Sequence, residues 1–183
     1  MQEMEKMLRG ELYNPANETL VKLRYNARVL FEQYNKTSIC EPEKRREILE
    51  KLLKKIGKNL YIEPDFKCDY GINIELGDDV YMNFNCIFLD VCKITVGNNV
   101  LFAPGVQVLT ATHPIDAKTR NNGLELAKPI TIKDNCWIGA GVLILPGVTI
   151  GENCTIGAGC VVNKDIPANS LVVGNPCKII KQI

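Results

Sequence analysis

The feature that most constrains the fold is a six-residue period of aliphatic side chains. In its most regular part, an isoleucine or valine returns every sixth residue, and a small or branched residue follows four places after each one. An α-helix has about 3.6 residues per turn and cannot keep a strict period of six on one face. The first positions are Ile132, Ile138, Ile144, Ile150, Ile156 and Val162, and the second positions are Cys136, Val142, Val148, Cys154, Cys160 and Ile166.

The same register continues upstream in two blocks, separated by shifts of two residues near positions 74 and 94. Three hexapeptides make one triangular coil of three short strands, joined by turns in which Gly, Asn and Asp suit the bent backbone. The sequence therefore predicts a mainly β solenoid of stacked coils, with both repeated positions pointing inward. The upstream positions are Val96, Phe102 and Val108 with Val100, Val106 and Thr112, and Leu76, Met82 and Phe88 with Val80, Cys86 and Cys92.

The chain contains eight cysteines, and the repeat accounts for most of them. A buried cysteine behaves as a small hydrophobic residue, so we interpret those at inward positions as packing residues. Cys40 and Cys177 lie outside the pattern. No CxxC pair is present, and a single histidine cannot complete the usual mixed Cys/His zinc patterns. The cysteines with predicted inward positions are Cys68, Cys86, Cys92, Cys136, Cys154 and Cys160.

Residues 1–57 have the pattern of helices instead. Two sets of apolar residues recur at intervals of three and four, which is typical of an amphipathic helix. Pro42 favours a helix start, and Gly57 favours a stop after Ile56. We predict a helical segment over 1–57, a solenoid over 58–175 and a tail over 176–183. The two sets are Leu20, Leu23, Ala27, Leu30, Phe31 and Tyr34, and Ile48, Leu49, Leu52, Leu53 and Ile56.

Charge and hydropathy exclude several classes of partner. Twenty-two Lys and Arg residues balance 21 Asp and Glu residues, which gives a formal charge of +1 and no electrostatic signature for nucleic acid or an anionic membrane. No apolar run approaches the length of a membrane span. The sequence MQEMEKMLRGELY lacks the apolar core of a signal peptide, so we expect a cytoplasmic protein.

The repeat breaks off just after His113, the only histidine, and resumes near Ile132. A repeat that is uniform along its length has no cleft, whereas an extruded loop over residues 114–128 can wall one off. Long loops inside compact domains are usually functional or disordered. The sequence therefore predicts a site beside His113.

Three segments carry a resemblance to a known family. They are MLRGELYNP with the later KLRYNAR, then CDYGINIELGDDVYMNFNCIFLD, and finally THPID with the run GLELAKPITIKDNCWIGAG and its continuation. Together they resemble the maltose and galactoside O-acetyltransferases, within the hexapeptide-repeat acyltransferases. The resemblance implies a left-handed parallel β-helix, although the usual crossover rule alone would favour the right-handed form. It also implies acetyl transfer from acetyl-CoA to a sugar hydroxyl, in a homotrimer with active sites between neighbouring chains.

The resemblance also implies roles for individual residues. His113 matches the catalytic histidine, and histidine, with an ordinary pKa of about 6.5, is suited to take a proton from a hydroxyl near neutral pH. Asn83 matches a residue that contacts the acceptor and the acetyl region, and Glu125 a carboxylate that orients the imidazole in some members. Asp69 matches an acceptor-binding position, and Arg24 is expected to reach the acceptor from the helical segment.

The acetyl-CoA groove is expected along the later coils, and the resemblance implies no metal. Ala140 and Ala158 match small residues that let the pantetheine chain approach the backbone. Lys164, Lys178 and Lys181 match positions near the nucleotide end of the cofactor. Relatives often carry arginine in the tail, and lysine offers a point charge rather than a bidentate fork.

Other functions of the same solenoid remain as alternatives. A xenobiotic O-acetyltransferase differs in its acceptor, and the helical start of 57 residues argues against it. A non-catalytic scaffold subunit needs neither a histidine beside a loop nor a groove of small residues. A γ-type carbonic anhydrase needs three histidine ligands for zinc, which one histidine excludes. The sequence does not indicate which sugar is the acceptor.

Overall fold

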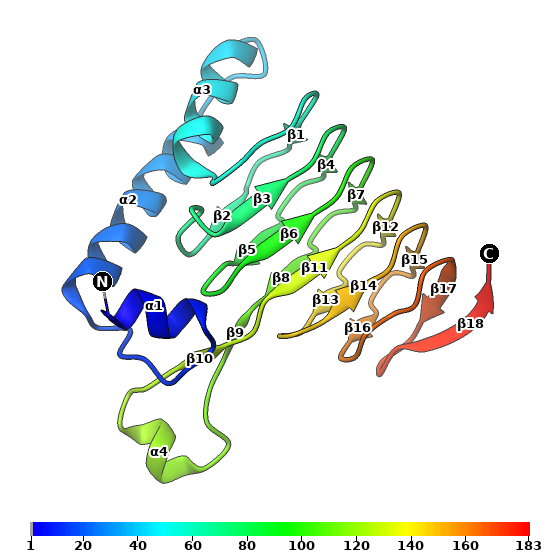
Figure 1. Ribbon diagram of the computed structural model, residues 1–183. Helices are drawn as coiled ribbons and strands as arrows, with labels where there is room; N and C mark the ends of the chain where they lie inside the picture. Colours follow the sequence, from blue (N-terminus) through cyan, green and yellow to red (C-terminus); the bar gives the residue numbers. More distant parts are fainter. Residues whose placement is uncertain (1) are drawn as a thin grey trace.

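The chain folds into a left-handed parallel β-helix, a triangular prism of stacked coils with helices across one end (Figure 1). The structure, a computed structural model, describes residues 2–183. The chain runs through three faces in order, and each of the first four coils adds one strand to each face. Parallel pairing joins the coils, so the predicted fold class is confirmed.

The three faces are named here in the order in which the chain visits them. Face 1 contains β1 (Tyr61–Ile62), β4 (Tyr81–Met82), β7 (Leu101–Phe102), β12 (Trp137–Ile138), β15 (Thr155–Ile156), β17 (Ser170–Val173) and β18 (Lys178–Gln182). Face 2 contains β2 (Lys67–Cys68), β5 (Ile87–Leu89), β8 (Gln107–Leu109), β13 (Leu143–Ile144) and β16 (Val161–Val162). Face 3 contains β3 (Ile74–Leu76), β6 (Ile94–Val96), β11 (Ile130–Ile132) and β14 (Thr149–Ile150).

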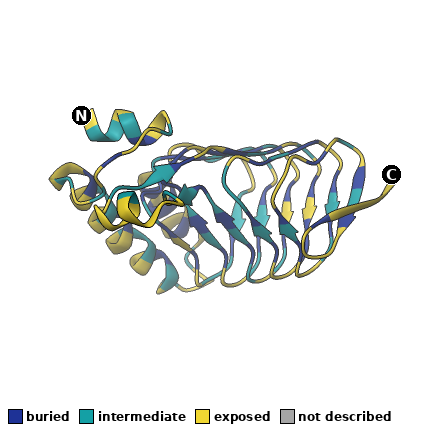
Figure 2. Cartoon of the chain, turned by 90° about the horizontal axis from the view of Figure 1, so that it is seen from below, coloured by how far each residue is buried: buried dark blue, intermediate teal, exposed yellow. Residues whose placement is uncertain are grey.

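The interior of the prism holds the repeated positions, as predicted. Almost all of them are buried and belong to one continuous core, and dark blue, buried segments recur from coil to coil along the prism (Figure 2). Two positions differ. Thr112 is half-exposed because its strand leaves the prism. Cys92 is buried, but it packs beneath the N-terminal segment, where its Sγ lies 3.4 Å from the carbonyl oxygen of Leu8.

The corner between faces 3 and 1 is built mainly from asparagine. A positive φ recurs there in every coil, and asparagine tolerates this conformation better than most residues. Asn135 Nδ2 donates to Asn153 Oδ1, and Asn153 Nδ2 donates to Asn169 Oδ1, so the corner side chains also link the coils. The positive-φ residues of this corner are Asn59, Asp79, Asn99, Asn135, Asn153 and Asn169.

The two-residue shifts in the repeat fall at the corner between faces 2 and 3. Ile74 pairs with Ile94, twenty residues later, whereas Thr131 pairs with Thr149, eighteen residues later. The early coils therefore carry two extra residues. These enlarge the same corner from which the long loop leaves in the next coil.

Three helices, α1 (Gln2–Leu8), α2 (Glu18–Asn35) and α3 (Pro42–Leu52), form a helical cap (Figure 1). Helices α2 and α3 cover the first coil, whereas α1 packs beside β10 (Leu126–Ala127). Asn17 caps α2 by accepting a hydrogen bond from the Thr19 amide. Pro42 begins α3 as predicted.

The predicted stop of α3 at Gly57 is wrong, because the helix ends at Leu52. The next residue, Leu53, is already extended, and the Lys55 amide donates to the Ile74 carbonyl at the edge of face 3. Gly57 serves a different purpose. A Cβ there would lie 2.1 Å from the carbonyl oxygen of Gly77, so only glycine permits this approach of two coils.

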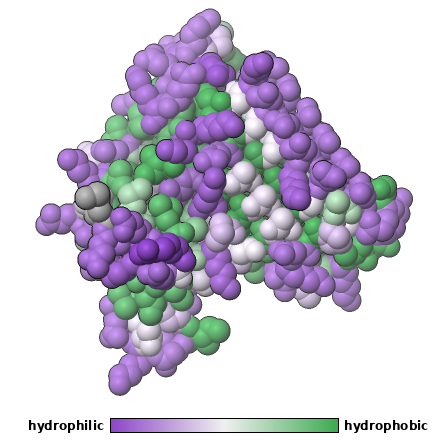
Figure 3. Space-filling model, in the orientation of Figure 1, coloured by the Kyte–Doolittle hydropathy of each residue, from purple (hydrophilic) through white to green (hydrophobic). Residues whose placement is uncertain are grey.

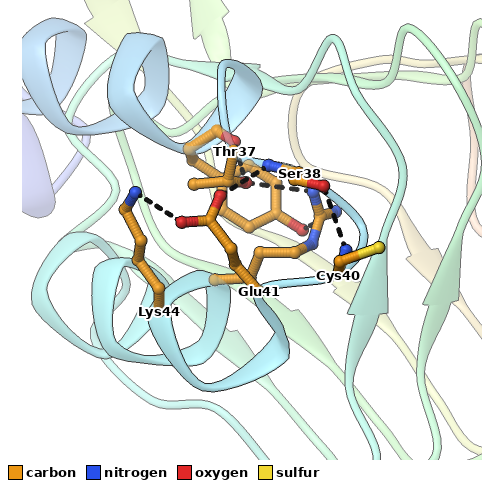
Figure 4. A network of polar contacts seen from close by, with 7 residues as sticks. Thr37, Ser38, Cys40, Glu41 and Lys44 are labelled. Atoms are coloured by element: carbon orange, nitrogen blue, oxygen red, sulfur yellow. Dashed lines mark hydrogen bonds and ion pairs between the residues drawn. The ribbon is translucent and has the colours of Figure 1, made fainter.

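The turn between α2 and α3 is held by side chains of the cap (Figure 4). Glu41 accepts a hydrogen bond from the Ser38 amide with one carboxylate oxygen and pairs with Lys44 through the other. Cys40 is exposed in this turn. Purple hydrophilic residues cover most of the cap in Figure 3, whereas pale and green residues lie over the middle of the molecule.

The extruded loop leaves the prism as a two-stranded ribbon. Strands β9 (Ala111–Thr112) and β10 (Leu126–Ala127) pair antiparallel, and the short helix α4 (Ala117–Asn121) lies beyond them. Figure 1 shows this segment projecting from the side of the prism. Arg120 donates to the carbonyl oxygens of Pro114 and Ile115, and Asp116 caps α4, so the loop has internal structure.

The C-terminal tail adds one antiparallel strand, β18, beside β17 on face 1. Within residues 2–183, no helix combines the length and the apolar character needed to cross a membrane.

Candidate active site

A cleft of about 530 Å³ lies at the corner between faces 2 and 3, under the N-terminal segment. We call it the corner cleft. Its walls come from the enlarged turns of the first two coils, the base of the extruded loop, and α2 with the segment before it. The lining residues that matter for chemistry are Tyr13, Arg24, Arg28, Asp69, Tyr70, His113 and Glu125.

His113 lies at the mouth of the ribbon, directly after β9. It lines the corner cleft and is exposed to solvent. A cleft is therefore present beside the only histidine, as the sequence predicted, and the loop over 114–128 contributes Glu125 to its lining. An exposed imidazole that lines a cleft has the access that proton transfer to a bound molecule requires.

Glu125, at the returning end of the loop, is held by Tyr13. The Tyr13 hydroxyl donates to Glu125 Oε2. In addition, the backbone amide of each residue donates to the carbonyl oxygen of the other. Burial raises the pKa of Tyr13 above its ordinary value, and the bond to Glu125 raises it further, so the hydroxyl stays a donor. Among the described residues, no hydrogen bond joins Glu125 to His113. The orienting role of Glu125 therefore stays a prediction.

Asp69 lines the opposite wall, in the enlarged turn after β2. Burial raises the pKa of its carboxyl, and the positive charge of Arg24 opposes that rise. Arg24 itself is anchored: it donates to the Tyr70 hydroxyl and to the Pro15 carbonyl oxygen. Its guanidinium fixes one wall of the cleft rather than pointing freely into it.

The structure does not bring Asn83 to His113 within one chain. Asn83 follows β4 and lies at the corner between faces 1 and 2, so the width of face 2 separates it from the corner cleft. Its Oδ1 accepts a hydrogen bond from the Phe84 amide. Ala140 and Ala158 follow β12 and β15 at the same corner as Asn83, and both are exposed.

The three predicted cofactor lysines are exposed and lie in the last coil or the tail. Lys164 follows β16 at the corner of His113, whereas Lys178 and Lys181 belong to β18. The thiol of Cys177 lies 4.0 Å from Asn163 Oδ1, which brings the start of the tail to the corner of Lys164.

Among the cleft residues that matter for chemistry, sequence reasoning missed three, namely Tyr13, Arg28 and Tyr70. Arg28 lies one helical turn after Arg24, so the spacing on α2 was a usable signal. Tyr13 and Tyr70 gave no such signal, because their positions depend on contacts with Glu125 and Arg24 that are distant in sequence. Within residues 2–183, no group of three or more His, Cys, Asp or Glu side chains is arranged to hold a metal ion.

Comparison with known proteins places this geometry in context. Residues 6–57 match the maltose acetyltransferase hexapeptide capping motif, and residues 129–164 match six bacterial transferase hexapeptide repeats. A galactoside O-acetyltransferase of Lactococcus lactis is 41% identical over 174 residues, covering 94% of this chain and 84% of that protein. The crystal structure of a maltose O-acetyltransferase from Clostridium difficile 630 superposes with a TM-score of 0.98 at 52% identity, covering 100% and 98% of the two chains. The chain belongs to the maltose and galactoside O-acetyltransferase family.

As an acetyltransferase of this family, the chain has a solved relative that carries the cofactor. A galactoside acetyltransferase in complex with coenzyme A superposes with a TM-score of 0.96 at 39% identity, covering 100% of this chain and 92% of that one. The helical cap and the later coils of this acetyltransferase coincide with the two matched segments. The extruded loop lies between those segments.

Proposed function

We propose that this acetyltransferase moves the acetyl group of acetyl-CoA to a hydroxyl of a sugar. The observation that carries the proposal is the corner cleft, in which the only histidine shares one cavity with two carboxylates and two tyrosines. Carboxylates accept hydrogen bonds from sugar hydroxyls, and aromatic rings offer flat apolar surface to a sugar ring. The relatives named as maltose and galactoside O-acetyltransferases support this acceptor class.

In the proposed reaction, His113 acts as general base. It takes the proton of the sugar hydroxyl while that oxygen attacks the thioester carbonyl carbon. The tetrahedral intermediate then collapses with cleavage of the carbon–sulfur bond, and the thiolate of coenzyme A receives the proton from His113. Tyr13 occupies one oxygen of Glu125, which leaves the second oxygen to accept the imidazole N–H and to orient the ring.

Asn83 enters this reaction from a neighbouring chain. Its amide is a suitable donor to the developing oxyanion, but its corner lies across face 2 from His113. Three copies around an axis, each with face 2 turned inward, bring the His113 corner of one copy beside the Asn83 corner of the next.

The composition of the faces supports this arrangement. Face 2 presents mostly aliphatic outward residues, whereas the outward residues of face 3 are Glu75, Thr95, Thr131 and Thr149. Apolar surface of this kind favours burial between subunits. The outward residues of face 2 include Ile87, Leu89, Leu109, Leu143 and Val161.

We place acetyl-CoA along the same intersubunit groove. On the Asn83 corner, Gly105, Gly141 and Gly159 have positive φ, and a Cβ at each would meet no atom within 4 Å. The space outside these glycines, with Ala140 and Ala158 beside them, admits a pantetheine chain to the backbone. Lys164 approaches the groove from the opposite wall, and Lys178 and Lys181 supply charge for the nucleotide phosphates.

The decisive experiment is an acceptor screen with acetyl-CoA. Glucose, maltose, methyl β-galactoside and chloramphenicol are each incubated with the enzyme, and the acetylated product is identified by mass spectrometry. Thiol release gives the rate, with a protein blank because Cys40 is exposed. We expect transfer to at least one sugar. Transfer to chloramphenicol alone would favour the xenobiotic class, and binding of acetyl-CoA without any transfer would contradict the proposal.

A further inference from the structure

The enlarged corner contains a buried carboxylate to which the proposed reaction assigns no role. Asp90 follows β5 and is completely buried. It is absent from the lining of the corner cleft, so it cannot touch an acceptor there. It lies directly behind the turn over residues 69–73, which contains the two extra residues of the first coil.

The carboxylate of Asp90 holds this turn through backbone amides. Its Oδ1 accepts hydrogen bonds from the amides of Asp69 (3.0 Å) and Tyr70 (2.8 Å), and its Oδ2 accepts one from Asn73 (3.2 Å). The Asn73 side chain donates to the Asp90 carbonyl oxygen at 2.7 Å. One buried residue therefore ties both ends of the turn that presents Asp69 and Tyr70 to the cleft.

The next coil shows that a corner of this kind closes without a charge. Thr110 is the residue aligned with Asp90, and its Oγ1 accepts a hydrogen bond from the Cys92 amide. Its hydroxyl also donates to the Leu89 carbonyl oxygen. A neutral hydroxyl thus suffices to fold that corner, whereas the Asp90 carboxylate accepts hydrogen bonds from three backbone amides.

Burial of a carboxylate is costly unless hydrogen bonds compensate for lost hydration. Burial raises the pKa of Asp90 to about 7, and the amide hydrogen bonds oppose that rise. Two titratable groups lie near the Asp90 carboxylate, namely Asp69 and the thiol of Cys68. The negative charge of Asp69 also raises the pKa of Asp90. Burial of the Asp90 carboxylate is costly, so its presence is better explained by its hold on the turn over residues 69–73 than by a contribution to folding stability.

We propose that Asp90 is a positioning residue that fixes the turn carrying Asp69 and Tyr70, and through that turn sets the affinity for the acceptor. This inference rests on the proposed function, because it assigns the turn to the sugar side of the reaction. Asp90 acts behind the cleft, and the groove for acetyl-CoA lies away from it.

The test is the variant Asp90→Asn, which keeps the shape of the side chain. The carbonyl oxygen of the asparagine can still accept hydrogen bonds from the backbone amides at one end of the turn. Its NH₂ group then faces the backbone amide at the other end, and two donors cannot form a hydrogen bond. We expect the KM for the sugar to rise about tenfold or more, with a smaller change in turnover at saturation. The Kd for acetyl-CoA should stay within about twofold. Amide exchange should accelerate in the peptide that covers residues 69–73.

Cys154→Ser is the matched control, since Cys154 is fully buried in a later coil at the corner away from the cleft. It should lower thermal stability but leave the sugar KM and the exchange of residues 69–73 unchanged. If Asp90→Asn does not fold, the variant Asn73→Ala tests the inference instead. It removes the bond to the Asp90 carbonyl and should raise the sugar KM in the same direction.

Three outcomes would overturn the inference. A folded Asp90→Asn enzyme with unchanged sugar KM would do so while leaving the proposed function intact. An equal loss of sugar and acetyl-CoA affinity would indicate a general structural role. A parent enzyme that acetylates no sugar in the screen would remove the proposed function, and the acceptor role of Asp90 with it.

Discussion

Tyr13 and Glu125 are separated by 112 positions in the chain, yet they share a side-chain hydrogen bond and two backbone ones. This link joins the segment after α1 to the returning end of the loop, beside the strand that leads to His113. At the scale of single residues, the corner cleft is therefore defined by pairs: Tyr13 with Glu125, Arg24 with Tyr70, and Asp90 with the turn of Asp69. His113 lines the same cleft as the first two pairs, and it keeps access to solvent.

Replacement of His113 by alanine should leave a folded protein with little turnover. The side chain is exposed, so its removal creates no internal cavity. Loss of a general base typically lowers the rate by about 10²- to 10⁴-fold. Steady-state kinetics with the best sugar of the screen would measure the effect. Glu43→Ala, an exposed change on α3, is the control and should behave like the parent. Near-parental turnover in His113→Ala would remove this residue from the mechanism.

At the scale of elements, sequence patterns predicted what is local and periodic. The inward register follows from side chains six residues apart, so it was readable, and so was the break beside His113. The end of α3 was not, because Lys54 and Lys55 leave the helix to pair with the edge of the first coil. The ribbon at the base of the loop, the burial of Asp90 and the contact of Tyr13 with Glu125 all depend on residues far apart in sequence. The spacing of residues in the sequence does not predict contacts of this kind.

The loop itself offers a test at this scale. Its base belongs to the fold, because Ala127 is buried against the N-terminal segment, but its tip does not. Ile115 is 98% exposed, which fits a tip that contacts a neighbouring chain. Replacing residues 115–123 with a short Gly-Ser link should leave the thermal midpoint nearly unchanged, because coils packed on their neighbours carry the stability.

The same variant should lose turnover on the order of tenfold or more, since the acceptor would be less well enclosed. The Kd for acetyl-CoA should change less, because the proposed groove lies mainly on the later coils. Calorimetry, ligand titration and kinetics on one preparation would measure the three quantities. Normal turnover in a well-folded variant would show that the tip has no part in catalysis.

At the scale of the whole molecule, the prism distributes the proposed chemistry over two corners. His113, Asp69 and Lys164 lie on one side of face 2, and Asn83 and Ala140 lie on the other. Under the proposed assembly, we expect these two corners to be half-sites that face different neighbouring chains. The aliphatic outward surface of face 2 connects them, and we expect it to be the contact between copies.

This arrangement makes a quantitative prediction for mixed assemblies. His113→Ala and Asn83→Ala should each be nearly inactive alone. Unfolded together in equal amounts and refolded, they should recover about a quarter of parental turnover, because each site draws one residue from each of two chains in a symmetric ring. The trimer mass is checked by light scattering. Simple mixing without subunit exchange is the control. No recovery in mixed trimers would mean that both residues act within one chain.

The antiparallel strand β18 has a consequence for the far end of the prism. A stack of parallel coils has two open ends, and an exposed end is a template on which another chain can add. The helical cap covers the first end. At the other, β18 runs against the direction of β17 and carries Lys178 and Lys181, so it cannot act as the next coil in the series. We therefore expect the reversal of one short strand to end the stack on face 1 and to disfavour growth of the molecule into a fibre.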